Sequence, residues 1–368
     1  MKVLLITNPG LEEVSKKEVN EILEIPLANI KNIYGGVIFE VKKLLDIVYV
    51  CYLCKSARRI LYLFGEFNEK TSFEKEFIDF FEDDISIAVR VEKNNEIDID
   101  GQNIERKVAD SIFEFLESNK KNAKVDLKNP ELPIIAFCSD KIYLGIDFAG
   151  FDLSSRPYRI FNNPRELKSN ICYGILRLAG FNGNEKTAII DCLSGTIAIE
   201  AGLYSLFKSP FYSIKESFAF NNFTIINIAD VAKIMQFLDS KQSEIKIDIF
   251  ALSDDTRSIN ATNKNSKIAS IANSINISKI DVDWLDTKFN KNFLDILIVQ
   301  RVNNYKEIFE KAKFVLNKKA TLAIILNSSK DTEELKKISK DFEFKFEKAH
   351  IIKSGKADII LELYKRLS

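Results

Sequence analysis

In the first 65 residues, the spacing of apolar residues alternates between the period of a strand and that of a helix. Leu11, Val14 and Val19, for example, recur on one side of a predicted helix. The predicted elements are, in order, a strand over residues 3–7, a helix over 11–22, a strand over 37–41, a helix over 44–53 and a strand over 60–64. Their spacing fits a β-α-β-β-α-β plan.

The next stretch, up to residue 152, predicts a second α+β unit. Its strands are predicted over residues 86–91, 134–137 and 142–146. The helix between the first two strands has apolar residues every three or four positions, at Ile104, Val108, Ile112 and Leu116. We therefore expect one helix between these strands.

From residue 188 onward, strands and helices alternate. A short apolar run over residues 188–190 is followed by small and polar residues and then by apolar residues at helical spacing, which predicts a buried strand, a tight turn and a helix. Such a turn brings the N–H groups of a helix start to the C-terminal edge of a parallel sheet, where α/β folds bind ligands. Further strands are predicted over residues 245–252 and 294–299. We expect a mostly parallel sheet with helices on both faces.

The composition leaves room for two or three domains and narrows the kinds of function. Lysine plus arginine and aspartate plus glutamate both number 53 among 368 residues, so any nucleic-acid site must be a local patch of cations. No apolar run approaches the ~18 residues of a membrane-spanning helix, and the apolar start over residues 1–6 is too short for a signal peptide. We therefore expect a cytoplasmic protein without a membrane partner.

Cysteine and histidine usage argues against metal binding and nucleophilic catalysis. The five cysteines are an odd number without the regular spacing of a disulfide framework. Cys51 and Cys54 form a Cys-x-x-Cys in an apolar segment without a second pair or a nearby histidine, so we expect no metal site. His350 is the only histidine of the chain, which disfavours catalysis by a Ser-His or Cys-His pair.

The turn after residues 188–190 carries a recognisable motif. Residues 192–201, Cys-Leu-Ser-Gly-Thr-Ile-Ala-Ile-Glu-Ala, resemble the S-adenosylmethionine-binding motif of the THUMP-containing RNA methyltransferases, Asp-Pro-x-Cys-Gly-Ser-Gly-Thr-Ile-x-Ile-Glu-Ala. The resemblance implies contacts with S-adenosylmethionine from Cys192, Ser194, Gly195 and Thr196. Leu193 replaces a glycine of the motif, and Asp191 directly precedes Cys192 without the proline and spacer. We expect the bulky Leu193 side chain to crowd the cofactor.

The same resemblance extends over nearly the whole chain. Residues 7–12 and 35–39 resemble the family's N-terminal ferredoxin-like domain, and residues 125–131, Val-Asp-Leu-Lys-Asn-Pro-Glu, resemble its THUMP domain. It implies an α/β multidomain protein of the tRNA guanine-N(2)-methyltransferase type. The implied parts are a ferredoxin-like α+β domain over 1–65, a THUMP RNA-binding domain over 66–152, a linker over 153–180 and a Rossmann-like methyltransferase domain over 181–368. Because THUMP domains bind RNA, particularly the acceptor end of tRNA, a tRNA-type partner is also implied.

The predicted linker holds a cluster of basic and aromatic residues. Side chains of these types bind phosphates and stack on bases. We expect RNA contacts from Arg156, Tyr158, Arg159, Arg165 and Lys168. The same residue mix fits a packed hinge between domains, and the sequence leaves both interpretations open.

Acidic residues follow the predicted strand over 245–252. The family has an aspartate there that accepts hydrogen bonds from both ribose hydroxyls of the cofactor, and Asp254 is its match. A carboxylate suits a diol because it accepts two hydrogen bonds. An N-cap for the helix through Ile259 and Ile268 is an equally physical role for this residue. Asp286 is the match to the family's adenine-contacting aspartate.

The segment after the predicted strand over 294–299 decides the expected chemistry. The family continues there with Asn-Pro-Pro-Tyr, which aims the exocyclic amine of a flipped base at the methyl group. Here residues 300–305 are Gln-Arg-Val-Asn-Asn-Tyr, without a proline, and Arg301 offers only hydrogen-bond donors. A register shifted by one residue makes Asn303, Asn304 and Tyr305 the candidate catalytic residues.

Two functions stay open on this sequence. One is a catalytically impaired or silent relative that binds RNA, or serves as the partner subunit of another protein, and the departures from both motifs favour it. The other is an active S-adenosylmethionine-dependent tRNA guanine-N(2)-methyltransferase with an unusual acceptor such as Asn303. A metabolic α/β enzyme has no support in the sequence.

Overall fold

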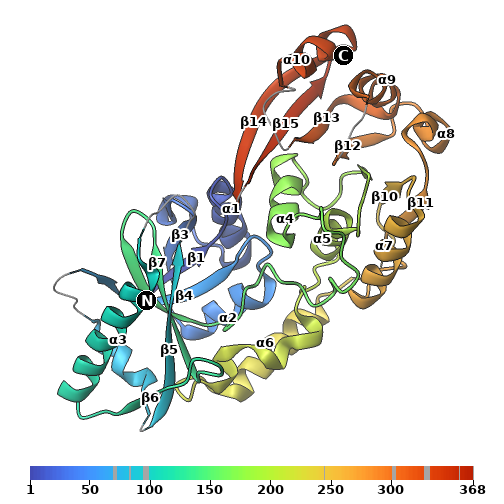
Figure 1. Ribbon diagram of the computed structural model, residues 1–368. Coiled ribbons are helices and arrows are strands. Elements are labelled where there is room, and N and C mark those ends of the chain that lie inside the picture. Colours follow the sequence, from blue (N-terminus) through green and yellow to red (C-terminus); the bar gives the residue numbers. More distant parts are fainter. Residues whose placement is uncertain are drawn as a thin grey trace. The chain divides into compact units, whose positions relative to one another are not determined.

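The computed structural model describes residues 1–68, 73–82, 84–93, 99–243, 245–300, 304–326, 332–355 and 357–367. By their internal packing, the described residues divide into two units (Figure 1). The first consists of Met1–Ser154 and Phe211–Ser240, and the second of Ser155–Pro210 and Lys241–Ser368.

The first unit is built on one mixed sheet with the strand order β2-β3-β1-β4-β8-β7-β5-β6. Its elements are β1 (Lys2–Ile6), α1 (Glu12–Leu23), η1 (Leu27–Asn29), β2 (Lys31–Ile33), β3 (Gly36–Glu40), α2 (Leu44–Leu53), β4 (Arg59–Phe67), η2 (Lys75–Phe80), β5 (Ile85–Lys93), α3 (Gly101–Ser118), β6 (Ala123–Val125), β7 (Leu132–Cys138), β8 (Ile142–Asp147), η3 (Tyr212–Ser217), η4 (Ala219–Asn222) and α6 (Ile228–Ser240). The predicted β-α-β-β-α-β plan is present, with β1 antiparallel to both β3 and β4. Antiparallel pairing of β4 with β8 continues the sheet into the second α+β part.

The pattern of apolar residues does not predict two short strands of this sheet, β2 and β6. In β2 only Ile33 is buried, while Lys31 and Asn32 are exposed. In β6 the last two residues, Lys124 and Val125, are also exposed. Both strands lie at an end of the strand order, where a strand needs no alternation of apolar side chains.

Helix α3 follows its predicted pattern. Its four apolar positions are buried, and the Asp100 carboxylate caps the helix by accepting a hydrogen bond from the N–H of Asn103 at 3.2 Å. Burying one such side chain stabilises by about 1.5–3 kcal/mol, whereas a cap contributes about 1 kcal/mol. Packing on the sheet therefore holds α3 in place, and the cap fixes where it begins.

Residues 211–240 pack into the first unit, although the sequence-based bounds assign them to the Rossmann-like domain. Phe223 joins the same buried cluster as Phe148, and their rings meet edge to face at 5.3 Å. Helix α6 lies against α2, where the Tyr52 hydroxyl donates to Asp239 at 2.6 Å. Residues 211–240 are therefore inserted in the sequence of the second unit but pack in the first. The other domain bounds stay predictions.

The second unit contains a mostly parallel sheet with the strand order β11-β10-β9-β12-β13-β15-β14. Its elements are α4 (Ser169–Leu178), β9 (Thr187–Ile190), α5 (Thr196–Ser205), β10 (Ile249–Ser253), α7 (Thr256–Ile268), β11 (Asn276–Lys279), η5 (Val282–Trp284), α8 (Leu285–Lys288), β12 (Leu294–Val299), α9 (Tyr305–Val315), β13 (Leu316–Leu326), α10 (Thr332–Asp341), β14 (Phe344–Ser354) and β15 (Ala357–Arg366). Strand β15 runs antiparallel to both of its neighbours, β13 and β14, and forms with β14 the closing hairpin drawn in red in Figure 1. The predicted Rossmann-like fold is confirmed.

Strand β9 positions the site. It pairs in parallel with β10 on one side and with β12 on the other, and its four residues are buried. The chain proceeds from β9 outward to β10 and β11 and later continues through β12 to β13, so the strand order reverses beside β9. In open α/β sheets the crevice at such a point, at the C-terminal strand ends, is where ligands bind.

Candidate functional site

A pocket of about 330 Å³ lies at the C-terminal ends of β9, β10 and β11, next to the start of α9. This volume is at the lower end of the roughly 300–1,000 Å³ that is usual for small-molecule sites. The residues that line the pocket are Arg165, Ile190, Asp191, Ser253, Asp254, Asp255, Ser258, Ile280, Asp281, Val282, Asn304, Glu307 and Ile308. All belong to the second unit and gather at the crevice that the strand order predicts.

Carboxylates dominate the electrostatics of this pocket. Five of its lining residues are acidic, and Arg165 is the only cation among the described lining residues. Burial raises the pKa of Asp191, and the Arg165 charge acts in the opposite direction. The excess of negative charge favours ligand groups that donate hydrogen bonds or carry positive charge, and it disfavours an anion.

Two neighbouring aspartates after β10 have different roles. Asp255 caps α7, because its carboxylate accepts hydrogen bonds from the N–H groups of Arg257 at 3.1 Å and Ser258 at 3.0 Å. Hydrogen bonding, first from the Ser258 hydroxyl, lowers the pKa of Asp255. The cap thus belongs to Asp255, while the exposed Asp254 carboxylate lies at the pocket, where a diol can donate two hydrogen bonds to it.

The turn after β9 has an unusual backbone conformation. Asp191, Leu193 and Gly195 have positive φ angles of 52°, 50° and 88°. A Cβ atom on Gly195 would lie 2.6 Å from Cγ2 of Thr262, so glycine alone fits there. Leu193 takes up its left-handed conformation at a cost of about 1–2 kcal/mol, and its side chain is buried instead of lining the pocket. The side chain therefore does not narrow this pocket, and the expectation that Leu193 crowds the cofactor stays a prediction.

Two buried side chains of α7 hold the turn in this shape. The Asn265 amide donates to the carbonyl oxygens of Ser194 at 3.0 Å and Phe161 at 3.1 Å, and its Oδ1 accepts from the N–H of Phe161 at 3.0 Å. The Thr262 hydroxyl lies 3.5 Å from the Cys192 thiol, whose pKa burial raises to about 12. These bonds are shielded from water, and they connect the turn to the linker.

The N-terminus of α5 is occupied by a side chain from the linker. The Glu166 carboxylate accepts hydrogen bonds from the N–H of Ser194 at 2.7 Å and the N–H of Thr196 at 3.0 Å, and also from the Ser194 hydroxyl. Gly195, the N-cap residue of α5, has no side chain with which to satisfy these groups. Glu166 therefore caps α5, although it belongs to another segment of the chain. Its carboxylate occupies the position at which the N-terminus of a helix can bind an anion.

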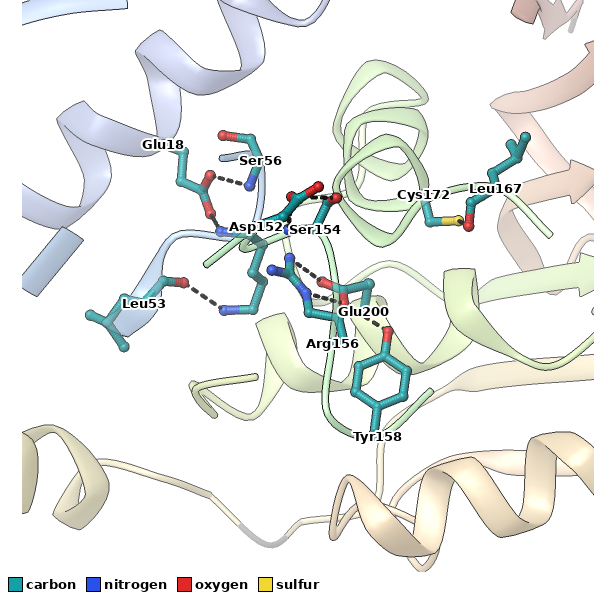
Figure 2. A network of polar contacts seen from close by, with 11 residues as sticks. Glu18, Leu53, Ser56, Asp152, Ser154, Arg156, Tyr158, Leu167, Cys172 and Glu200 are labelled. Atoms are coloured by element: carbon teal, nitrogen blue, oxygen red, sulfur yellow. Dashed lines mark hydrogen bonds and ion pairs between the residues drawn. The ribbon is translucent and has the colours of Figure 1, made fainter. Parts of the chain in front are cut away.

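A second glutamate anchors the linker to the interior of the unit. Figure 2 shows Glu200 of α5 between Arg156 and Tyr158. The Arg156 guanidinium donates to both carboxylate oxygens, at 2.9 and 3.3 Å, and the Tyr158 hydroxyl donates to Oε1 at 2.7 Å. The side chains of Arg156 and Glu200 are fully buried, and burial followed by the Glu200 charge raises the pKa of Tyr158.

This arrangement corrects part of the expected RNA site. Arg156 and Tyr158 cannot contact RNA in this conformation, because both are buried and hydrogen-bonded to Glu200. Arg159 is half-buried, whereas Arg165 and Lys168 are exposed. For the first two residues the structure favours the packed alternative, and RNA contact by the other three stays a prediction.

The acidic residue after β11 also differs from the expected one. Asp286 lies on α8 and pairs with Lys311 at 2.8 Å, and this hydrogen bond lowers the pKa of Asp286. It does not line the pocket, whereas Asp281, just beyond the end of β11, does. Asp281 is therefore nearer to the strand end than Asp286, and adenine contact by Asp286 stays a prediction.

The expected catalytic segment after β12 is described in part. Arg301 and Asn303 lie outside the described residues. Asn304 lines the pocket, but its side-chain oxygen caps α9 by accepting a hydrogen bond from the N–H of Glu307 at 3.4 Å. Tyr305 packs against the hydrophobic core and does not line the pocket, so it offers no stacking surface there.

Within the described residues, no group of three or more His, Cys, Asp or Glu could hold a metal ion. The five cysteines are buried and form no disulfide bonds. None of the helices in the described ranges combines the length and the apolar character that crossing a membrane requires.

Residues 156–354 match a family model described as RMKL-like, methyltransferase domain. The chain belongs to the RMKL-like methyltransferase family. Residues 74–147 of this RMKL-like chain also match the THUMP domain, within the first unit. The family resemblance expected from the sequence is thus confirmed.

Curated relatives of this RMKL-like chain methylate RNA according to their names. The tRNA (guanine(6)-N2)-methyltransferase of Archaeoglobus fulgidus is 29% identical over 203 residues, which cover 53% of this chain and 51% of that protein. The ribosomal RNA large subunit methyltransferase K/L of Alteromonas mediterranea is 28% identical over 228 residues, which cover 59% of this chain and 32% of that protein. The chain thus spans about half, or less, of the length of these relatives.

Solved structures share the whole fold. SMU.472, a candidate methyltransferase solved with SAH, matches over 100% of this chain and 98% of its own, with a TM-score of 0.78 and 19% identity. TrmN from Thermus thermophilus matches over 100% of this chain and 99% of its own, with a TM-score of 0.67 and 14% identity. At such identities these likenesses establish the fold alone.

The family motif and the observed pocket overlap only partly in this RMKL-like chain. The expected cofactor residues Cys192, Ser194, Gly195 and Thr196 are buried in the turn and do not line the pocket, and their contacts with a cofactor stay predictions. Glu166, whose carboxylate accepts hydrogen bonds from the turn, is a residue that the sequence pattern does not predict. Its one signal is that Gly195 leaves the start of α5 without a capping side chain, so that an acceptor has to come from elsewhere.

Proposed function

We propose that this chain binds an adenosine-containing cofactor of the S-adenosylmethionine type and an RNA, with tRNA as the favoured class, and that its capacity for methyl transfer is impaired. The observation that carries the proposal is the role of Asn304. Its amide oxygen is used to cap α9, in the segment where an amine acceptor is needed.

The pocket fits the nucleoside part of such a cofactor. Asp254 offers two acceptor oxygens for a ribose diol, and Asp281 offers an acceptor for an adenine amino group. Ile190, Ile280 and Val282 supply apolar surface for the faces of the base. S-adenosylmethionine, when bound, supplies a methyl group on a positively charged sulfur, which suits a pocket lined by carboxylates.

RNA binding is supported by the THUMP match and by the names of the relatives. Arg165 and Lys168 are exposed on the linker, and Arg165 also lines the pocket. An RNA held by the THUMP domain needs a cation near the pocket to guide its phosphates toward the reacting end. We assign this guiding role to Arg165.

Methyl transfer to an exocyclic amine needs a positioned acceptor. The amine nitrogen attacks the methyl carbon while the carbon–sulfur bond breaks, and a proton then leaves the nitrogen. Orientation can supply about 7–11 kcal/mol of such a barrier. The Asn304 oxygen already accepts one of the two hydrogen bonds that it can accept, and Tyr305 does not line the pocket, so the described residues supply little of that orientation.

The second candidate function is an active tRNA guanine-N(2)-methyltransferase. The observation that favours it is the retained pocket with Asp254 free of the capping role. In that case Asn303, outside the described residues, would be the acceptor.

A single-turnover methyl-transfer assay separates the two functions. Excess protein is mixed with total tRNA and radiolabelled S-adenosylmethionine, and the label in RNA is counted. The impaired form gives no labelled RNA above a protein-free control. Label that approaches one methyl group per tRNA, and that disappears in Asp254→Ala, would establish the active enzyme instead.

The RNA part is tested separately by salt-dependent binding. Arg165→Ala should weaken tRNA binding and reduce the slope of log affinity against log salt by about 0.7–1. Lys233→Ala, which removes an exposed charge from α6, is the matched control and should leave the slope unchanged. Equal slopes for the protein and Arg165→Ala would contradict RNA contact by the linker.

A further inference from the structure

The turn after β9 presents donors for an anion, and the chain itself supplies the anion. The N–H groups of Ser194 and Thr196 and the Ser194 hydroxyl all donate to the Glu166 carboxylate. These groups stand at the start of a ten-residue helix, whose dipole adds to the attraction of negative charge. In this conformation the anion-binding groups of the turn are already used.

The cofactor considered above has one anionic group, the carboxylate of its amino-acid part. The adenosine part has none. The pocket is lined by five carboxylates, so a ligand carboxylate placed among them is repelled. The turn offers that group backbone N–H donors only when Glu166 is absent from them.

We propose that Glu166 is a specificity residue that competes with the cofactor's carboxylate for the turn. While Glu166 occupies the turn, the site accepts adenosine compounds that lack an amino-acid carboxylate. S-adenosylmethionine and S-adenosylhomocysteine bind fully only after they displace the Glu166 side chain. This inference rests on the proposed nucleoside-binding function of the pocket and adds to it a distinction between two classes of ligand.

The position of Glu166 allows such an exchange. Glu166 is half-buried and precedes α4 on an irregular segment, where its own N–H donates to the carbonyl of Asn163 at 2.9 Å. The chain on either side is held independently, by the bonds of Asn265 to Phe161 and by helix α4. Rotation of one side chain therefore frees the turn without unfolding its supports.

The test is a pair of calorimetric titrations of the full chain. S-adenosylhomocysteine carries the amino-acid carboxylate, and 5′-methylthioadenosine lacks it but keeps the adenosine and the sulfur. Glu166→Ala should tighten binding of S-adenosylhomocysteine ten-fold or more and change binding of 5′-methylthioadenosine by less than two-fold. Glu166→Gln should give an intermediate gain, because a neutral amide oxygen competes less well for the same donors.

Glu185→Ala is the matched control. The Glu185 carboxylate also accepts hydrogen bonds from two backbone N–H groups, those of Asn182 at 2.7 Å and Asn184 at 3.2 Å, but it does not line the pocket. This variant should change neither affinity. Thermal unfolding of all variants verifies that each is folded at the titration temperature.

Four outcomes would contradict the proposal, and they are distinguishable. If Glu166→Ala changes neither of the two affinities, the competition alone is refuted. A parallel loss of both affinities would show that Glu166 is a structural cap. If neither nucleoside binds to the protein or to any folded variant, the proposed nucleoside function fails and the inference fails with it. If S-adenosylhomocysteine affinity rises in Arg165→Ala but not in Glu166→Ala, Arg165 and not Glu166 is the residue that discriminates between the two ligands.

Discussion

Two glutamates hold helix α5, and they do so in different ways. Glu200 lies within the helix, fully buried, and is held by the charged Arg156 and by the Tyr158 hydroxyl. Glu166 reaches the N-terminus of the helix from the linker, is only half-buried, and is held by backbone N–H groups. The nitrogen donors of the two carboxylates lie at similar distances, between 2.7 and 3.3 Å.

The difference between them lies in what can replace each carboxylate. The Glu200 side chain is fully buried, so losing a partner leaves a buried charge unsatisfied. The donors around Glu166 face a carboxylate that is only half-buried, and under the proposed exchange another anion satisfies them. Glu200 therefore fixes the linker permanently, whereas Glu166 makes an exchangeable contact.

The largest effect should come from breaking the buried pair. Arg156→Ala leaves Glu200 charged in the interior and should lower the free energy of unfolding by about 3–5 kcal/mol. Urea denaturation measures this loss. In the control Lys313→Ala, which breaks an exposed pair with Glu343, the loss should stay below about 1 kcal/mol. Similar losses in the free energy of unfolding for the two variants would contradict the burial of the Arg156–Glu200 pair.

The next effect concerns the third member of the buried group. Tyr158→Phe removes one hydrogen bond to the Glu200 carboxylate and keeps the ring, so the free energy of unfolding should fall by about 1.5–3 kcal/mol. The same denaturation experiment measures it. A double variant with Arg156→Ala should lose less than the sum of the two single losses, because both bonds serve one carboxylate. Additive losses would argue against a shared partner.

Removing Glu166 should affect stability far less. Glu166→Ala should lower the free energy of unfolding by about 1 kcal/mol, the usual contribution of a helix cap. Asp255→Ala, which removes the carboxylate cap of α7, is the natural comparison and should give a loss of similar size. A loss for Glu166→Ala as large as that for Arg156→Ala would remove the distinction between the fixed and the exchangeable glutamate.

The smallest effect is a pH dependence at the turn. Burial raises the pKa of Asp191, so the folded protein binds its proton more tightly than the unfolded chain, whose aspartates titrate near pH 4. The stability that this proton provides is present below about pH 4 and is lost as the pH rises through the folded pKa. Asp191→Asn should therefore gain stability relative to the protein between about pH 4 and 7, by less than about 1 kcal/mol because the site is half-exposed. Denaturation curves across this range that stay parallel would contradict the raised pKa.

The sequence predicts the fold well because the pattern of apolar residues is set by burial. The strand over 294–299 and the buried positions of α3 are found where they are predicted. What the pattern cannot predict is the return of residues 211–240 to the first unit, since phenylalanine-rich segments pack equally well on either core. Edge strands such as β2 are missed because they bury too few side chains to leave a pattern.

The candidate site is less predictable, because partners distant in the sequence decide each role. Arg156 is of a residue type that often contacts RNA. It is buried here because its guanidinium is hydrogen-bonded to Glu200, 44 residues later. Asp254 and Asp255 are equivalent in the sequence until the geometry of α7 makes Asp255 the cap. Glu166 has no signal of its own, because its role depends on a glycine in another segment.

The exchange at the turn is tested most directly by crystal structures of the full chain with 5′-methylthioadenosine and with S-adenosylhomocysteine. With 5′-methylthioadenosine, Glu166 should remain hydrogen-bonded to the N–H groups of Ser194 and Thr196. With S-adenosylhomocysteine, the ligand carboxylate should occupy those groups and the Glu166 side chain should be turned away. A bound S-adenosylhomocysteine beside an unmoved Glu166 would contradict the account.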